Sequence, residues 1–134
     1  EGVFFIATCN HVERLPPELI RKGRFADEIF FVDLPTEAER GEILRIHVER
    51  YLSTVGHAPL PLPLYAGMME GFTGAEIEHV VKKALILALN ERRPAEPGDL
   101  TRAIDAEIPQ SRSMAESISE MRELVSEGRY LSAS

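Results

Sequence analysis

The sequence predicts a small α/β segment of two strands and a short helix, followed by an all-α domain that ends in an extra helix. Two runs rich in β-branched and aromatic residues, 3–8 and 28–32, predict the strands. After Pro35 the apolar residues recur at helical spacing, and capping-box sequences begin at Thr36 and Thr73. These three observations divide the chain into an α/β part and a helical part.

A polar residue and two arginines follow the first predicted strand. Asn10 comes just after the carboxyl end of this strand, where open α/β sheets commonly place groups that face a ligand. A short helix is predicted next, at 15–19, because a proline near its start is followed by good helix formers. Arg21 and Arg24 then lie three residues apart, with a glycine between them. Guanidinium groups bind phosphate oxygens in a forked geometry, so this grouping points to phosphate chemistry.

The helical part is predicted to contain several helices separated by proline and glycine. The strongest begins at Thr73, because the apolar residues from Ile77 onward follow the i, i+3, i+4, i+7 spacing of a helix that faces a core. The segment 55–63 holds three prolines and predicts a connecting loop. The predicted helices lie at 36–52, at 64–69, from Thr73 to before Pro94, at 99–106, and from Ser113 onward. The first of these is expected to carry a broad apolar band, made of Ile43, Leu44, Ile46, His47, Val48 and Tyr51.

Composition disfavours several classes of function. A net charge of −7 argues against general nucleic-acid binding, because counterion release needs a basic surface. The single cysteine, Cys9, excludes an internal disulfide, and no run of residues is long and apolar enough to predict a membrane span. The histidines show no H-E-x-x-H spacing, so no metal site is expected. We expect a cytoplasmic protein without nucleic-acid or membrane partners.

Residues 3–25 resemble the second half of an AAA ATPase module, which is a P-loop NTPase. In that family the asparagine after this strand is called sensor 1, and arginines at the positions of Arg21 and Arg24 are called arginine fingers. The resemblance implies that Asn10 acts on the nucleotide of its own chain. It implies that the two arginines reach the nucleotide of a neighbouring subunit and stabilise the transition state of ATP hydrolysis. A homo-oligomer in the form of a ring follows from this arrangement.

The helical part carries a second motif of the same family. The sequence Gly71-Phe72-Thr73-Gly74-Ala75-Glu76-Ile77 matches the signature of the small lid that follows the nucleotide-binding domain of AAA proteins. The resemblance implies that Gly74 and Ala75 line the nucleotide pocket by close backbone approach. It also implies that Ile43 packs against the adenine and that His47, one turn later, contacts the ribose.

The part of an AAA module that cradles the phosphates does not occur in this sequence. There is no G-x-x-x-x-G-K-[ST] loop, and no strand ending in paired carboxylates precedes residue 3. We therefore expect a carboxyl-terminal fragment of a longer AAA+ ATPase, in which 1–35 ends the large domain and 36–134 forms the lid. The full-length parent is expected to bind ATP and Mg²⁺ and to hydrolyse ATP, with a protein as one option for its substrate. The fragment alone is expected to hold no cofactor and to be inactive.

The last segment indicates a group within the family. Residues 108–116 and the sequence Met121-Arg122-Glu123-Leu124 are similar to those of the uncharacterised AAA proteins first catalogued as chloroplast open reading frames, which are common in cyanobacteria and other bacteria. The chain departs from the family in one place, since Ala26 intervenes before Asp27. The loop after Arg24 is therefore expected to be one residue longer than usual.

Each candidate residue also has a purely structural explanation. Asparagine is a common turn former, arginines suit the carboxyl end of a helix, histidine suits a helical core, and glycine suits a helix start. The apolar stripe from Met114 to Val125 is expected to pack on the lid, although it would also suit a helix that binds a partner. The alternative for the whole chain is a non-enzymatic helical module that binds another protein through 36–134.

Overall fold

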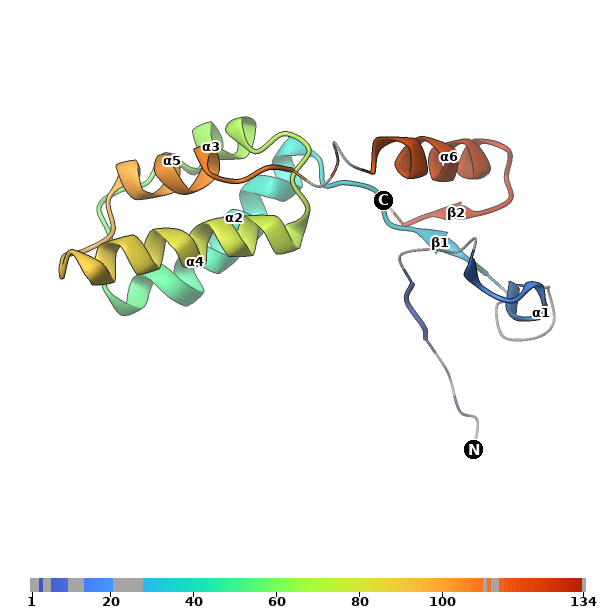
Figure 1. Ribbon diagram of the computed structural model, residues 1–134, viewed down its shortest axis with the longest axis horizontal. Helices are drawn as coiled ribbons and strands as arrows, with labels where there is room; N and C mark the ends of the chain where they lie inside the picture. The colour runs from blue at the N-terminus through green and yellow to red at the C-terminus, as the bar shows by residue number, and fades with distance from the viewer. Residues whose placement is uncertain are drawn as a thin grey trace.

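The computed structural model describes residues 3, 6–9, 14–20, 28–109, 111 and 114–133. Helices α2 to α5 form a bundle at one end of the molecule, and α6 lies beside two short strands at the other end (Figure 1). This arrangement confirms the predicted fold class, a small α/β part followed by helices. In chain order the elements are α1 (Pro17–Ile20), β1 (Phe30–Phe31), α2 (Glu37–Tyr51), the 3-10 helix η2 (Leu52–Thr54), α3 (Leu62–Met68), α4 (Gly74–Asn90), α5 (Pro97–Asp105), α6 (Ala115–Ser126) and β2 (Leu131–Ser132).

Two capping boxes begin α2 and α4, as the sequence predicts. At α2 the Thr36 hydroxyl accepts a hydrogen bond from the Glu39 N–H at 3.4 Å, and the Glu39 carboxylate accepts one from the Thr36 N–H at 2.8 Å. Thr73 and Glu76 repeat this pattern at α4, with distances of 3.3 and 2.8 Å. Each box satisfies two N–H groups that would otherwise lack a partner, so local sequence sets both helix starts.

The core of the bundle is built around the apolar stripe of α4, which packs against α2 and α5. The predicted stripe is confirmed, since its members are fully or partly buried: Ile77, Val80, Val81, Ala84, Leu85 and Ala88. The apolar band on α2 is narrower than expected, because Leu44 and Val48 are buried whereas Ile46 is 47% exposed. At 3.6 residues per turn, position 46 points away from the side that carries positions 44 and 48.

The observed strands differ from the two that the sequence predicts at 3–8 and 28–32. Only Phe30–Phe31 of the run 28–32 forms a strand, and its parallel partner is Leu131–Ser132 near the far end of the chain. The Leu131 N–H donates to the Ile29 carbonyl at 2.9 Å, and the Ala133 N–H donates to the Phe31 carbonyl at 3.0 Å. The described residues of the first predicted strand, 3 and 6–8, do not form a strand. A strand needs a hydrogen-bonding neighbour, and here a segment distant in sequence provides it.

Helix α6 lies beside β1 and contributes no residue to the core of the bundle. Arg122 donates hydrogen bonds to both carboxylate oxygens of Asp33, at 2.8 and 2.9 Å. These bonds hold the pKa of Asp33 below its ordinary value. The apolar stripe of α6 is half-buried, but its main contact is with β1 and none of its residues packs on the core of the bundle, so the expectation that it packs on the lid is wrong. The division of the whole chain at residues 35 and 36 stays a prediction.

Gly71, in the loop before α4, lies against Ser111 of the segment that follows α5. Its φ is +79°, and a Cβ atom built on it would lie 2.7 Å from the Ser111 Oγ. We expect Gly71→Ala to lower the free energy of unfolding by roughly 1–2 kcal/mol, because alanine strains a left-handed backbone and displaces Ser111. Urea unfolding checks this, with Gly98→Ala as the control, since a Cβ there meets no atom within 4 Å. Equal stabilities of the two variants would contradict the expectation.

Candidate functional site

Two rows of side chains face each other where α2 packs on α4. Within each row the residues are four apart, so they lie on one side of their helix. The rows consist of Ile43, His47 and Tyr51 on α2, and of Gly74, Glu78 and Lys82 on α4. We call these six residues the α2–α4 face. The sequence predicts three of them as site residues, namely Ile43, His47 and Gly74, and does not point to the other three.

One end of the α2–α4 face is apolar and lies at the start of α4. The Ile43 Cδ1 atom lies 3.8 Å from the position that a Cβ atom on Gly74 would occupy. Both residues are half-buried, and Ala75 is exposed beside them. The first N–H groups of an α-helix lack partners within the helix and give this end a partial positive charge. A flat apolar group and an anion could therefore both approach this end of the face.

The other end of the face is a polar cluster around Tyr51. The Tyr51 hydroxyl donates a hydrogen bond to the Glu78 carboxylate, and the Lys82 ammonium lies 2.9 Å from the same oxygen. The Lys82 Nζ also lies 5.1 Å from the centre of the Tyr51 ring. The hydrogen bond from Tyr51, followed by that from Lys82, lowers the pKa of Glu78 to about 2. The Glu78 carboxylate is therefore charged at neutral pH.

His47 lies between these two ends. Its ring stacks on Tyr51, with 6.0 Å between the ring centres and 14° between the ring planes. The Nδ1 atom of His47 is buried and has no hydrogen-bond partner among the described residues. Buried polar atoms in native proteins are nearly always hydrogen-bonded. The His47 Nδ1 atom is therefore the clearest sign on this face of a ligand from outside the described residues.

The remaining predicted site residues, Asn10, Arg21 and Arg24, lie outside the described residues, so their positions and roles stay predictions. The short helix expected before the arginines is present as α1, at Pro17–Ile20. Tyr51, Glu78 and Lys82 could have been found from the sequence by following a spacing of four residues along each helix. That spacing alone, however, does not show which faces of the two helices meet.

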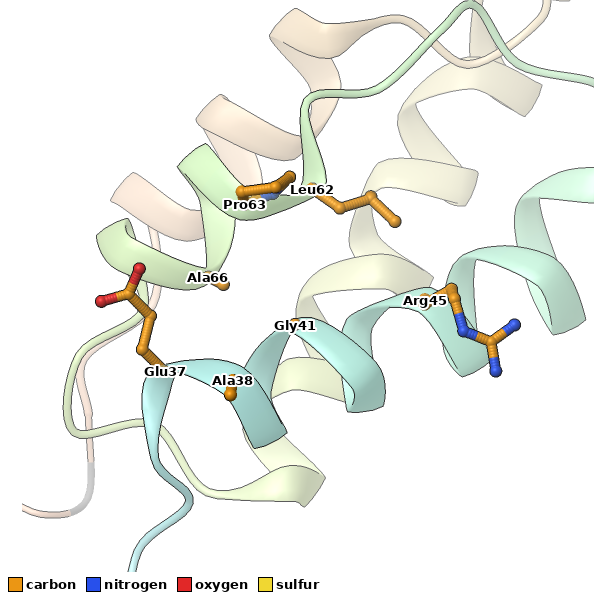
Figure 2. Close-up of a pocket in the computed structure, with 7 residues that line it drawn as sticks. All are labelled: Glu37, Ala38, Gly41, Arg45, Leu62, Pro63 and Ala66. Carbon is orange, nitrogen blue, oxygen red and sulfur yellow. The ribbon is translucent and has the colours of Figure 1, made fainter.

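A separate groove lies between α2 and α3 (Figure 2). It has a volume of about 640 Å³ and a mostly apolar lining. The two helices are close at Gly41, where an added Cβ atom would lie 3.8 Å from the Ala66 Cβ, an ordinary van der Waals contact. The Arg45 side chain extends away from α3 and is held by Glu42 at 2.7 Å. None of the lining residues belongs to the α2–α4 face: Glu37, Ala38, Gly41, Arg45, Leu62, Pro63 and Ala66.

The described part of the chain lacks two other kinds of feature, a cluster of metal ligands and a helix that could span a membrane. No group of three or more His, Cys, Asp or Glu side chains that could hold a metal ion occurs among the described residues. In the same residues, no helix has the length and apolar character needed to cross a membrane. The single cysteine, Cys9, is exposed.

Comparison with known proteins shows what the chain is similar to. Residues 62–101 match the AAA+ lid domain family. The uncharacterized AAA domain-containing protein ycf46 of Guillardia theta is 33% identical over 132 residues, which cover 98% of this chain and 26% of that protein. The proteasome-activating nucleotidase of Sulfurisphaera tokodaii is 38% identical over 106 residues, or 78% of this chain and 26% of that protein. The ATP-dependent zinc metalloprotease FtsH of Mycoplasmopsis synoviae is 41% identical over 92 residues, or 67% of this chain and 13% of that protein.

The chain spans about a quarter of the length of the ycf46 relatives that it matches. The matched lid region contains α3, α4 and the first half of α5, and it therefore includes the α4 side of the α2–α4 face. The ycf46 match extends over nearly the whole chain and includes the α2 side as well. Taken with the helical bundle, these matches show that the chain belongs to the AAA+ ATPase family and carries its lid domain.

Proposed function

We propose that this chain forms the lid side of an ATP site in a longer AAA+ ATPase, and that the α2–α4 face holds the nucleoside. The observation that carries the proposal is the buried Nδ1 atom of His47, which has no partner among the described residues. One turn before it on α2, Ile43 meets Gly74 at the apolar end of the face. Membership of the AAA+ ATPase family makes ATP with Mg²⁺ the expected ligand.

The described residues fit a nucleotide. Because Gly74 has no side chain, the Ile43 Cδ1 atom stays open to a flat base. A ribose hydroxyl both donates and accepts hydrogen bonds, so it suits the His47 Nδ1 atom in either tautomer. Phosphate oxygens suit the N–H groups of Gly74 and Ala75 at the start of α4. When bound, ATP supplies the γ-phosphoryl group that is transferred to water, and the task of these residues is to bind and orient it.

In this proposal Asn10, Arg21 and Arg24 are the catalytic residues. Phosphoryl transfer depends mainly on positioning and on neutralising the charge that spreads over the γ-phosphate. An asparagine amide can donate to that phosphate or orient the attacking water. Guanidinium groups stay charged and bind oxygens in pairs, which suits stabilisation of the transition state. Since the arginines would act on the nucleotide of a neighbouring subunit, we propose a homo-oligomeric ring as the active form.

ATP hydrolysis by the full-length protein tests the role of the arginines. We expect Arg21→Ala to reduce turnover by roughly 10³-fold, the lower end of what an arginine finger supplies. Arg14→Ala is the matched control, because Arg14 is exposed and precedes α1, and it should keep normal turnover. A mixture of Arg21→Ala with a variant defective in phosphate binding should recover activity, because each subunit supplies what the other lacks. Normal turnover by Arg21→Ala would overturn the assignment.

The alternative function is a helical module that binds another protein without enzymatic activity. The groove between α2 and α3 favours it, together with Leu64 and Met68, which are exposed on α3. The same assays separate the two functions. Under the ATPase proposal the pure 134-residue chain does not hydrolyse ATP, because it lacks a phosphate-binding loop. If the full-length protein has no turnover either, the interaction module is the better description.

A further inference from the structure

We propose that Tyr51 and Glu78 are positioning residues, which hold the His47 imidazole in the orientation that the nucleotide needs. This inference rests on the proposed function of the α2–α4 face. It adds to that function two residues from facing helices that act on the ligand only through His47. The inference that Tyr51 and Glu78 orient His47 rests on the contacts around the Tyr51 ring.

The Tyr51 ring is held from several sides. Its hydroxyl is bonded to the Glu78 carboxylate of α4, so the ring is tied to the neighbouring helix. Two cations lie over the ring, with the Lys82 Nζ 5.1 Å and the Arg50 Cζ 5.3 Å from its centre. Such contacts are attractive because the ring face is electron-rich. The Tyr51 ring is therefore a fixed surface for a neighbour to stack on.

The His47 imidazole stacks on the Tyr51 ring. The two rings lie nearly parallel, at 14° and 6.0 Å between centres. No hydrogen bond from a described residue fixes the ring through Nδ1. The contact with the Tyr51 ring is therefore the ring contact that restrains the imidazole, since aromatic pairs prefer stacked or edge-on arrangements at such separations. The orientation of Nδ1 toward a ligand therefore depends on Tyr51.

Glu78 contributes a second effect, which is electrostatic. It lies close enough to His47 for the two groups to interact electrostatically. Its Oε1 atom is already bonded to the Tyr51 hydroxyl and lies 2.9 Å from the Lys82 ammonium. These partners keep the carboxylate engaged and leave the imidazole free for a ligand. Without the Tyr51 hydroxyl, the carboxylate is freer to turn toward the imidazole and compete with the nucleotide.

Calorimetric titration of the full-length protein with ATP tests the inference. We expect Tyr51→Phe to raise the Kd for ATP about fivefold, the size of one net hydrogen bond. Glu78→Gln should raise it by less, because glutamine still accepts the hydrogen bond from Tyr51 but lacks the charge that strengthens it. His47→Ala should raise the Kd at least as much as Tyr51→Phe does, and adding either substitution to His47→Ala should cause no further loss, because both act through the imidazole. Glu42→Gln is the matched control, since this carboxylate lies on α2 outside the face and is bound to Arg45 at 2.7 Å.

A spectroscopic measurement on the 134-residue chain is independent of nucleotide binding. We expect Tyr51→Phe to change the imidazole NMR signals of His47 and to leave those of His57 and His79 unchanged, because the hydrogen bonds of these two rings go to Ala58 and Glu107. A stacked neighbour that merely filled space would leave the His47 signals nearly unaltered by loss of a hydroxyl. Glu78→Gln provides a second variant with the same expected change, so a folding defect in one leaves the other informative.

The outcomes distinguish this inference from the function on which it rests. If His47→Ala leaves the Kd for ATP unchanged, the proposed role of the α2–α4 face in nucleotide binding falls. If His47→Ala weakens binding while Tyr51→Phe and Glu78→Gln do not, the nucleotide site stands and the positioning role is overturned. If the losses from Tyr51→Phe and His47→Ala add fully in the double variant, Tyr51 acts independently of His47 and the inference is again overturned.

Discussion

Asp99→Ala is expected to lower the free energy of unfolding by about 3 kcal/mol, because it removes one partner of a buried ion pair. Asp99 is 0% exposed although it carries a charge. Its carboxylate accepts hydrogen bonds from Arg93 at 2.7 and 2.9 Å and from Arg102 at 2.7 Å. It also accepts one from the N–H of Glu96, just before α5, at 2.9 Å. Since both arginines reach solvent, the loss is expected at the lower end of the range for such pairs.

Urea unfolding of the 134-residue chain measures this effect. Asp105→Ala is the matched control, because Asp105 is exposed at the end of the same helix and its removal should change stability little. A similar small change for both variants would show that the Asp99 cluster is not a main support of the bundle. The measurement therefore tests whether the start of α5 is held by charge or by the apolar core alone.

The same carboxylate predicts a pH dependence of stability. Hydrogen bonds from the Arg93 guanidinium hold the pKa of Asp99 well below its ordinary value of about 3.9. A carboxylate with a lowered pKa in the folded state stabilises the fold above its unfolded pKa, and this contribution is lost as the pH falls through the folded pKa. Asp99→Asn should therefore lose less stability than the wild type below about pH 4. Equal losses in the two proteins would contradict this role of the charge.

Leu44→Ala is expected to have an effect of similar size, about 3 kcal/mol of unfolding free energy. Leu44 is 0% exposed and belongs to the core that joins α2 to α4. Truncation removes apolar contacts and leaves a cavity that the surrounding helices fill only in part. The α2–α4 face depends on the same packing of α2 against α4. Removing the Leu44 side chain should therefore also make the position of His47 on this face less fixed.

Thermal or urea unfolding checks the Leu44 prediction against a control on the same helix. Ile46 is 47% exposed, and Ile46→Ala should cost less than about 1 kcal/mol. If Ile46→Ala proved as damaging as Leu44→Ala, the assignment of the inner side of α2 would be wrong. This pair of variants thus tests the correction that the structure makes to the broad apolar band expected on α2.

Features that depend on nearby residues could be predicted from the sequence. The capping boxes at Thr36 and Thr73 each involve residues three apart, and both helix starts lie where they were expected. The stripe on α4 follows from 3.6-residue periodicity, and its residues are buried. Membership of the AAA+ family could be predicted because continuous motifs carry it, above all the run from Gly71 to Ile77.

The partner of each strand could not be predicted in the same way. β1 pairs with β2, which lies almost at the other end of the chain, although the tail after Gly128 has no strong strand signal. The bond between Asp33 and Arg122 and the position of α6 beside β1 depend on the same long-range contact. Pairing between distant segments is decided by which edges and charges are left unpaired in the folded chain, and short sequence windows do not contain that information.

The residues of the candidate site also fall into two groups, those that could be predicted from the sequence and those that only the packing of the helices brings together. The resemblance to the AAA family selects Ile43, His47 and Gly74 as candidates, because it rests on short continuous stretches of sequence, and their roles stay predictions. The proposal for Tyr51 and Glu78 depends on the packing of α2 against α4, since their hydrogen bond joins the two helices. The lack of a partner for the His47 Nδ1 atom among the described residues is likewise a property of packing, because burial and the choice of partners are set by every element that surrounds the ring.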